Sequence, residues 1–410
     1  MADIRVFPIR ILPRMSNLES LHVLEKVGVD PLARENLLGK MKHVNVHLRG
    51  IECHIANIIK QEMLSLGGDA AVARDTVSCR LEATDVVLMG TFKQVHRFAR
   101  RIKAQPFGLK YLSDQLEAIL LNQEADHLLL RTSQRDMVFA KSTLLMGILN
   151  VTPDSFSDRE RYLQTDAAIY RALTMVEEGA DIIDIGGESS RPGARPISVE
   201  EELKRVIPVI EGLRGKVDVP VSVDTTKAMV AQKAMEAGAE IINDISAMTR
   251  DSRMAEVVAE TKAAVVLMHM KGVPETMQQD VPVYPDLLGE VTDYLSGRIY
   301  EALSCGIRQE NILVDPGIGF GKTIDHNLDI IRYLSEFRIW GRPILVGVSR
   351  KSFIGTITDT KPDEREEGTI AAMVAVIMNG ARVVRVHDVC RMKKAIAVAD
   401  AIVYGNDRVT

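Results

Sequence analysis

Several features that would place this chain outside the cell, in a membrane or on nucleic acid are missing from its sequence. The 410 residues include only four cysteines, none of them in a CxxC pair, so we expect no structural zinc site and a reducing compartment, the cytoplasm. The formal net charge is −5, which lacks the basic excess that phosphate backbones need, so we expect no nucleic-acid partner. The N-terminus shows no basic segment followed by an apolar one, and therefore predicts no signal peptide.

Long uninterrupted hydrophobic runs are also missing. The most apolar long segment, residues 369–386, contains Asn379, Gly380 and Arg382, which indicates a core helix, a turn and a strand, with no membrane partner. Hydrophobic residues nevertheless make up 46% of the chain, enough for a large core, and the length favours two domains.

From Lys141 onward, apolar runs alternate with helical segments. The runs are near-continuous Val, Ile and Leu, typical of strands covered on both faces. Eight such units in roughly 270 residues predict an α/β fold, a (β/α)8 TIM barrel, with a doubly wound sheet as the alternative. The expected strands are 143–149, 181–185, 219–223, 240–242, 263–268, 311–314, 343–348 and 382–386. The expected helices are 166–178, 199–214, 226–237, 252–261, 286–304, 325–336, 366–379 and 390–402.

The preceding residues predict a smaller α/β or α+β domain, 1–123, before a barrel domain at 124–410. A hairpin within 124–141 is expected to plug the N-terminal mouth of the barrel. The small domain is expected to contain strands at 4–12, 44–48, 77–81 and 85–89 and helices at 17–38, 51–66, 92–105 and 109–122.

Two features of the small domain resemble binding sites but have simpler explanations. The turn Gly67-Gly68-Asp69 could contact an anion, although such a turn more often caps a helix. His43, His47 and His54 straddle a strand and a helix start, so we interpret them as surface histidines with no shared face.

Polar residues follow the barrel strands, where barrel enzymes carry their chemistry. Asn150 ends the first strand, and Asp224, Asn243 and Asp315 end the third, fourth and sixth. Buried carboxylates need donors, which a flat heterocycle with amino and ring N–H groups supplies. An ion pair within the barrel explains any one of these residues, but not eight polar strand ends together.

The other strand ends are cationic. Lys351, Arg385, His387 and Arg191 suit a phosphate-bearing ligand, with arginine as the bidentate partner. The amide oxygen of Asn150 suits Mg²⁺, a hard cation that usually works with phosphates.

Other residues near these ends need separate interpretation. The sequence Gly321-Lys322-Thr323 resembles a phosphate-binding P-loop, but Pro316 stands where that motif needs glycine. Met268 either packs or lines an aromatic pocket. His269 is expected to point into the barrel wall, and Glu188 to support other residues by hydrogen bonding.

The strand ends together resemble the dihydropteroate synthase family, in order and at family-like spacing. The segments that carry the resemblance are 146–158, 184–194, 223–225, 243–247, 267–278, 315–322, 347–355 and 385–389. The resemblance implies a (β/α)8 barrel that joins 6-hydroxymethyl-7,8-dihydropterin pyrophosphate to p-aminobenzoate, giving 7,8-dihydropteroate and pyrophosphate with Mg²⁺ as cofactor.

The same resemblance implies roles for particular residues. The pterin is held by Asp224, Asn243, Asp315 and Lys351, beside Met268. Pyrophosphate is bound by Asn150, Arg385 and His387, with Asn150 on the metal. The first two loops close over the site and shape the p-aminobenzoate pocket through Asp154, Phe156, Ser190, Arg191, Pro192, Phe320, Lys351 and Ser352. Many relatives have Thr where this chain has Ser190, and both residues offer a hydroxyl.

Two other functions remain open from the sequence. A pterin-dependent methyltransferase acting on a corrinoid protein shares the barrel, but has no use for the pyrophosphate-binding cations. A non-catalytic pterin-binding protein is the other alternative. Relatives are commonly homodimers through helices near the C-terminus, so a homodimer is expected. Residues 1–123 lack the paired aspartates of the pyrophosphokinase fused to some relatives, which leaves an accessory role in oligomerisation or regulation.

Overall fold

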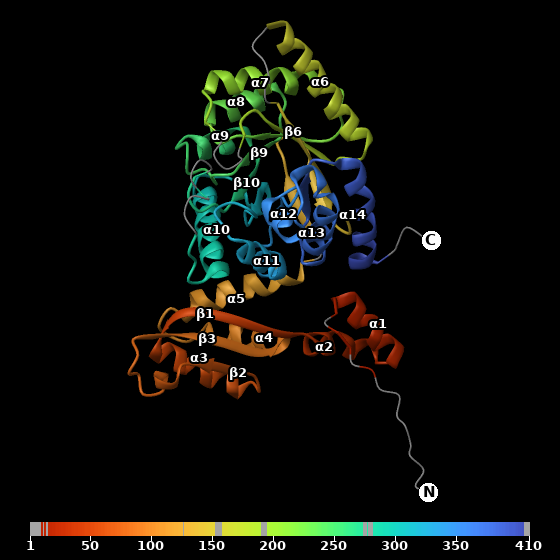
Figure 1. The fold of residues 1–410 in the computed structure, drawn as a ribbon. Coiled ribbons are helices and arrows are strands. Elements are labelled where there is room, and N and C mark those ends of the chain that lie inside the picture. Colours follow the sequence, from red (N-terminus) through yellow and green to blue (C-terminus); the bar gives the residue numbers. More distant parts are fainter. Residues whose placement is uncertain are drawn as a thin grey trace. The chain divides into compact units, whose positions relative to one another are not determined.

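The computed structural model describes residues 10, 12–13, 15–125, 127–151, 158–189, 195–273, 277 and 282–405. The chain divides into two compact units, Met1–Glu124 and Ala125–Thr410, which follow one another along the colour scale of Figure 1. Of the strand expected at 4–12, residues 4–9 and 11 lie outside the described residues. So do five of the expected site residues, which are Asp154, Phe156, Ser190, Arg191 and Pro192.

The first unit is an α+β domain with a three-stranded antiparallel sheet in the order β1-β3-β2. Buried residues of three helices form one core with Val86 and Leu88 of the central strand. Its helices are α1 (Asn17–Val27), α2 (Pro31–Met41), α3 (Cys53–Ser65), α4 (Phe92–Ile102) and α5 (Leu109–Glu124), and its strands are β1 (His43–Glu52), β2 (Asp69–Val72) and β3 (Ala83–Thr91).

Two of the secondary-structure elements expected in this unit are wrong. The helix expected at 17–38 is two helices, because Gly28 adopts φ 82° and ends α1, and the Asp30 side chain caps α2. The strand expected at 77–81 is absent from the described sheet, whose second edge is β2 instead. Val77 is 75% exposed, so this apolar run has no sheet partner and lies at the surface.

The two candidate binding features of this unit have structural explanations. Gly67 and Gly68 follow α3 and donate N–H groups back to its last turn, and a Cβ on Gly68 would lie 2.3 Å from the Met63 methyl carbon. His43, His47 and His54 are all exposed, as expected. His43 and His47 do share one face of β1, contrary to expectation, because they lie four residues apart on a strand.

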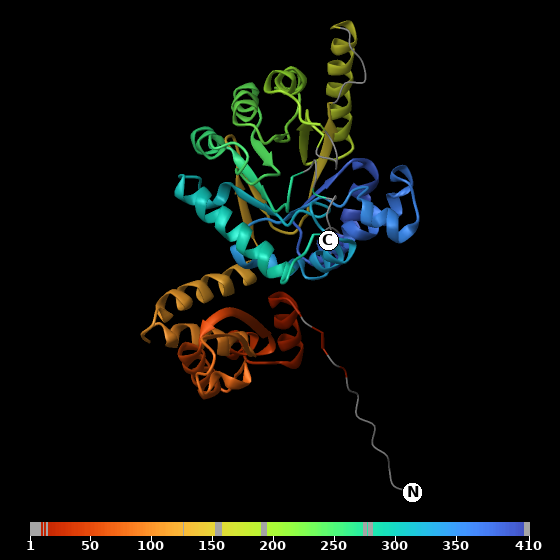
Figure 2. The ribbon, with the colours of Figure 1, turned by 60° about the vertical axis from the view of Figure 1, so that its left-hand side comes forward.

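The second unit is the predicted barrel. Its eight parallel strands run in the order β11-β10-β9-β8-β7-β6-β13-β12, and a parallel bridge between Val314 and Ile344 joins the two ends of the sheet. Figure 2 shows the strands gathered at the centre with helices around them. The strands are β6 (Leu144–Asn150), β7 (Ile182–Gly186), β8 (Val221–Asp224), β9 (Ile241–Asp244), β10 (Ala264–Met268), β11 (Ile312–Asp315), β12 (Leu345–Val346) and β13 (Val383–Val386).

A helix follows nearly every strand, and their apolar faces form one large core with the outer faces of the strands. The helix expected at 325–336 ends earlier, at Arg332, and continues as a 3-10 helix, while α12 was not expected. None of the described helices is long and apolar enough to cross a membrane. The helices are α6 (Asp158–Glu177), α7 (Val199–Leu213), α8 (Ala228–Ala237), α9 (Met254–Thr261), α10 (Leu287–Ser304), α11 (Ile324–Arg332), α12 (Ser352–Thr358), α13 (Glu366–Met378) and α14 (Val389–Tyr404).

A short hairpin closes the N-terminal mouth of the barrel, as the sequence predicts. Its strands β4 (Leu128–Arg131) and β5 (Asp136–Phe139) are antiparallel. Leu130 and Phe139, both fully buried, share a core cluster with residues from the interior of the barrel strands. Arg135 and the Thr132 hydroxyl both bond to Glu240 at the start of β9, which fixes the hairpin to the barrel wall.

The hairpin plug provides a test of the fold. Replacing Phe139 by alanine leaves a cavity at the base of the barrel and should lower the free energy of unfolding of this unit by about 3–5 kcal/mol. The neighbouring Val138 is 64% exposed, so Val138→Ala should change it by less than about 0.5 kcal/mol. Urea denaturation followed by circular dichroism measures both, and equal effects would contradict the plug.

Candidate active site

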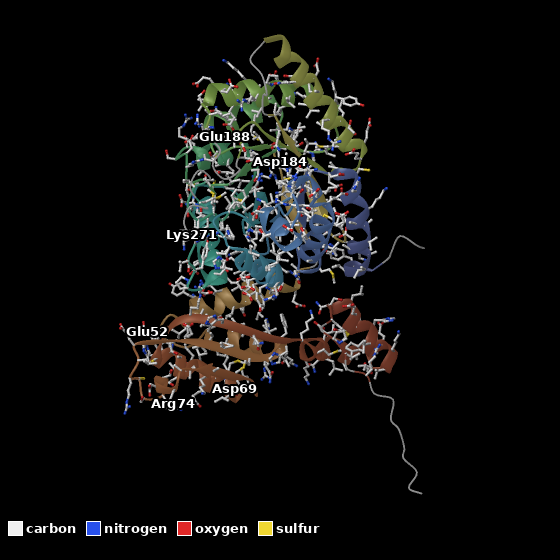
Figure 3. The ribbon with its side chains drawn as sticks, viewed as in Figure 1. Glu52, Asp69, Arg74, Asp184, Glu188 and Lys271 are labelled. Carbon is white, nitrogen blue, oxygen red and sulfur yellow. The ribbon has the colours of Figure 1, made fainter. Side chains whose placement is uncertain are left out.

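The C-terminal ends of the barrel strands bring five of the polar residues together. Asp224, Asn243 and Asp315 lie at the ends of β8, β9 and β11. Asp184 and Arg385 lie within the last three residues of β7 and β13. Asp224 is in register with Asn243, and Met268 with Asp315, so residues far apart in the sequence become neighbours. Figure 3 labels Asp184 in the strand-end region of the barrel.

Arg385 is the hub of this cluster. Its Nε donates to Asp184 Oδ2 at 2.6 Å and its Nη2 to Asp224 Oδ2 at 2.7 Å. The side-chain amide of Asn243 donates to the same oxygen of Asp184 at 3.1 Å. Charge-assisted bonds of this kind offset the cost of burying two carboxylates.

Asp184 is the residue that the sequence interpretation missed. The strand-end pattern assigns it no role, although it is completely buried and contacts both Arg385 and Asn243. Its Oδ1 has no partner among the described residues, and neither has Ser222 Oγ, which is in register with it on β8. Its strand-end position, immediately before Ile185 and Gly186-Gly187, was the available signal.

Burial shifts pKa values in the site toward neutrality. Burial raises the pKa of Asp224, which Arg385 opposes, and raises the pKa of Asp315 to about 6. Burial lowers the pKa of Lys351 to about 8. The pKa values of Asp315 and Lys351 are therefore closer to neutrality than those of exposed carboxyl and ammonium groups, as is common at functional sites.

Lys351 and Phe320 form a second part of the site. The Lys351 ammonium lies 4.1 Å from the centroid of the Phe320 ring, a cation–π contact. Arg350, just before it, has φ 57°, a conformation that turns the chain sharply between β12 and α12. Ser352 is the exposed first residue of α12. Phe320 therefore comes from the loop after β11, whereas Lys351 and Ser352 come from the start of α12.

The remaining expected residues lie around the same mouth. Asn150 is exposed at the end of β6, and its Oδ1 and Asp224 Oδ2 both lie 3.8 Å from the point that a Cβ on Gly186 would occupy. His387 Nδ1 lies 2.9 Å from Ser349 Oγ, which joins the loops after β12 and β13. Met268 is buried at the end of β10.

Glu188 supports the site, as the sequence predicts. It is paired with Lys227, which also bonds to the buried Glu202, and its other oxygen accepts from Ile197 N. These contacts join the end of β7 to the starts of α7 and α8. His269 is buried in the barrel wall, also as predicted, and contacts Lys322.

Several proteins of known function resemble this chain in sequence or in fold. Residues 146–387 match the family model described as pterin binding enzyme. The dihydropteroate synthase of Synechocystis is 49% identical over 265 residues, which are 64% of this chain and 91% of that protein. The Escherichia coli dihydropteroate synthase is 45% identical over 271 residues, 64% of this chain and 95% of its own.

Solved structures and a longer relative extend the comparison. The Xanthomonas albilineans dihydropteroate synthase with 4-aminobenzoic acid is 42% identical with a TM-score of 0.62, covering 67% of this chain and 98% of that one. A probable bifunctional folylpolyglutamate synthase/dihydropteroate synthase of Halobacterium salinarum is 40% identical over 391 residues, 94% of this chain but 46% of the relative. That match is too long to be confined to the barrel.

The fold and the cluster of buried polar groups therefore define a barrel enzyme that binds a polar heterocycle. The chain belongs to the family of pterin binding enzymes, and within that family it groups with the dihydropteroate synthases.

The raised pKa of Asp315 gives a test of the pterin site. Its carboxyl becomes protonated below about pH 6, and a protonated carboxyl loses the charge that attracts ring N–H donors. The affinity for 6-hydroxymethylpterin, which has no phosphate to titrate, should therefore fall as the pH drops through 6, by about tenfold per unit at most. Isothermal calorimetry between pH 5 and 7.5 measures this.

The control for this experiment is Asp315→Asn, which has no proton to gain at that position. It should bind weakly throughout and show a shallower dependence on pH. An affinity of the unaltered protein that stays constant over this range would contradict a role for the Asp315 carboxylate.

Proposed function

We propose that this protein condenses 6-hydroxymethyl-7,8-dihydropterin pyrophosphate with p-aminobenzoate to form 7,8-dihydropteroate and pyrophosphate, a transferase step of folate biosynthesis. The observation that carries the proposal is the cluster of Asp184, Asp224 and Asn243 around Arg385 at the strand ends, in a chain 49% identical to a dihydropteroate synthase.

The pterin is assigned to the acidic part of the cluster. Its amino and ring N–H groups suit Asp224 and Asp315, its carbonyl oxygen suits Lys351, and Asn243 can both donate and accept. Met268, buried at the end of β10, offers an apolar contact for the ring. Because a carboxylate oxygen accepts more than one hydrogen bond, pterin donors can engage Asp224 beside Arg385, whose guanidinium also suits phosphate oxygens.

Pyrophosphate is assigned to Arg385, His387 and Asn150, with Mg²⁺ on the amide oxygen of Asn150. A single amide oxygen suits Mg²⁺, which usually keeps waters and takes phosphate oxygens beside one or two protein ligands. When bound, the ion neutralises charge on the leaving pyrophosphate.

The reaction then needs little acid–base help. The methylene C–O bond breaks as pyrophosphate leaves, and the electron-rich pterin ring delocalises the positive charge that develops. The arylamine nitrogen forms the new C–N bond with its free lone pair and then loses a proton to solvent. Phe320, Lys351 and Ser352 are assigned to the p-aminobenzoate pocket. The first two loops complete it through Asp154, Phe156, Ser190, Arg191 and Pro192 and exclude water.

An assay of pyrophosphate release tests the proposal. Release should require both p-aminobenzoate and Mg²⁺, and EDTA should abolish it. Methyl transfer from methyltetrahydrofolate to a corrinoid protein, without pyrophosphate release, would indicate the methyltransferase instead. Pterin binding without either reaction would indicate a non-catalytic protein.

Two variants examine the assigned residues in the same assay. Asp224→Ala and Lys351→Ala should abolish dihydropteroate formation, since each removes a charged group from the buried site, while circular dichroism shows the fold intact. Asp329→Ala, which removes an exposed carboxylate on α11, should leave turnover unchanged. Full turnover by either site variant would overturn its assignment.

The protein is further proposed to be a cytoplasmic homodimer. Its four cysteines are free, as in a reducing compartment. Met378 on α13 and Val398 and Ile402 on α14 are 56%, 62% and 63% exposed, and such apolar side chains on neighbouring helices suit a subunit interface. The first unit has its own core and is assigned an accessory role.

The dimer can be tested at this helical face. Val398→Lys combined with Ile402→Lys places two charges in the interface and should give a monomer by light scattering. Tyr300→Lys, at a 75% exposed position on α10, is the matched control and should leave the mass unchanged. A dimer that survives the double substitution would contradict this interface.

A further inference from the structure

The loop after β11 contains a buried lysine that the proposed reaction does not use. Lys322 is 7% exposed, and its ammonium is enclosed by backbone oxygens. It donates to Gly317 O at 2.9 Å, to Phe320 O at 3.1 Å and to His269 O at 3.3 Å, and it lies 2.9 Å from His269 Nδ1. The side chain thus fills a cage of carbonyls that would otherwise face one another without a donor.

The loop that forms this cage packs closely against the segment after β10. Gly317, Gly319 and Gly321 have φ of 71°, 81° and 60°, values that glycine adopts readily and that residues with a Cβ rarely adopt. A Cβ on Gly317 would lie 1.9 Å from His269 O, and one on Gly321 would lie 2.2 Å from Lys271 O. The loop backbone is therefore pressed against the segment that follows β10, and Lys322 joins the two.

The same loop contacts the site on its other side. The Phe320 ring lies 4.1 Å from the Lys351 ammonium, and a Cβ on Gly319 would lie 3.0 Å from Lys351 Cδ. Gly319 N donates to Asn327 Oδ1 at 2.7 Å, which holds the loop to α11. The Phe320 carbonyl bonds to Lys322 while its ring contacts Lys351, so one residue links the buried cage to the site.

An apolar side chain at position 322 would fill the space but not this role. The carbonyls of Gly317 and Phe320 would lose their common donor, and the turn between them would no longer be drawn toward His269. Because Phe320 lies inside that turn, its ring would lose its fixed distance from Lys351. Asp315 and Thr323, before and after the turn, make other hydrogen bonds. Asp315 Oδ1 accepts from Gly317 N, and Thr323 Oγ1 accepts from His326 N.

We propose that Lys322 is a positioning residue, which holds the Phe320 ring against Lys351 and so shapes the pocket for the aromatic amine. The proposal rests on the proposed function, because it assigns that pocket to p-aminobenzoate. It also explains the Gly-Lys-Thr sequence without a nucleotide, since the lysine binds the protein's own backbone.

Steady-state kinetics of Lys322→Met test this role. The KM for p-aminobenzoate should rise about tenfold, while kcat and the KM for the pterin pyrophosphate change by less than about threefold. Lys233→Met, which removes an exposed lysine on α8, is the matched control and should leave all three constants unchanged. Equal losses for both substrates would overturn the proposal, because they indicate general damage to the barrel.

A double-mutant cycle with Phe320→Leu shows whether the lysine acts through Phe320. If it does, Lys322→Met should raise the KM for p-aminobenzoate by less than about threefold in the Phe320→Leu background. Full additivity of the two effects would overturn the proposal. A merely structural role of Lys322 would not produce this coupling.

Two further measurements keep the outcome decisive. If Lys322→Met does not fold, His269→Gln removes the imidazole that contacts Lys322 and that also packs edge-on against Tyr294. It should raise the KM for p-aminobenzoate about threefold, and the absence of a rise would overturn the proposal. Absence of dihydropteroate formation by the unaltered protein overturns the proposed function. Normal turnover by that protein, with an unchanged KM in the variants, overturns the positioning role alone.

Discussion

The ion-paired cluster of Arg385 with Asp184 and Asp224 is the interaction on which the barrel site depends. Three different strands supply these groups, and Asp184 and Arg385 are separated by 201 positions in the sequence. Burying one such charge without its partners is costly, so the strands must close before the cluster becomes stable. The cluster is therefore stable only in the closed barrel.

The cluster also connects stability to chemistry. Carboxylates that are held by a guanidinium in the free protein are prepared to accept N–H donors from a ligand, since each oxygen can take more than one bond. Burial keeps the pKa of Asp315 near 6 and that of Lys351 near 8, so the site is adjusted to neutral conditions by its environment. The hairpin at the opposite mouth fills the barrel interior and leaves only the strand ends for chemistry.

A second layer of buried charges supports the loops around the cluster. Glu188, Lys227 and Glu202 join the end of β7 to the helices behind it, and Lys322 joins the loops after β10 and β11. Lys227 and Lys322 bond to other groups of the protein. Among the described residues, neither lysine is hydrogen-bonded to Arg385, Asp184 or Asp224. The site residues are thus positioned by a surrounding set of satisfied polar groups, which is how barrel loops keep a fixed geometry.

The barrel is predictable from the sequence, because eight buried strands must be apolar throughout, and each observed strand lies within two residues of its expected bounds. It also indicated the strand-end residues Asp224, Asn243, Asp315 and Arg385. Local pattern failed where partners decide, as at Val77, an apolar residue that no strand pairs with, and at Gly28, whose left-handed conformation divides a helix. The partners of Asp184 and Lys322 depend on how the strands and loops pack in the folded protein. A lysine 53 residues from His269 carries no local sign that it will fill a cage of carbonyls, because that cage exists only once the loops have packed.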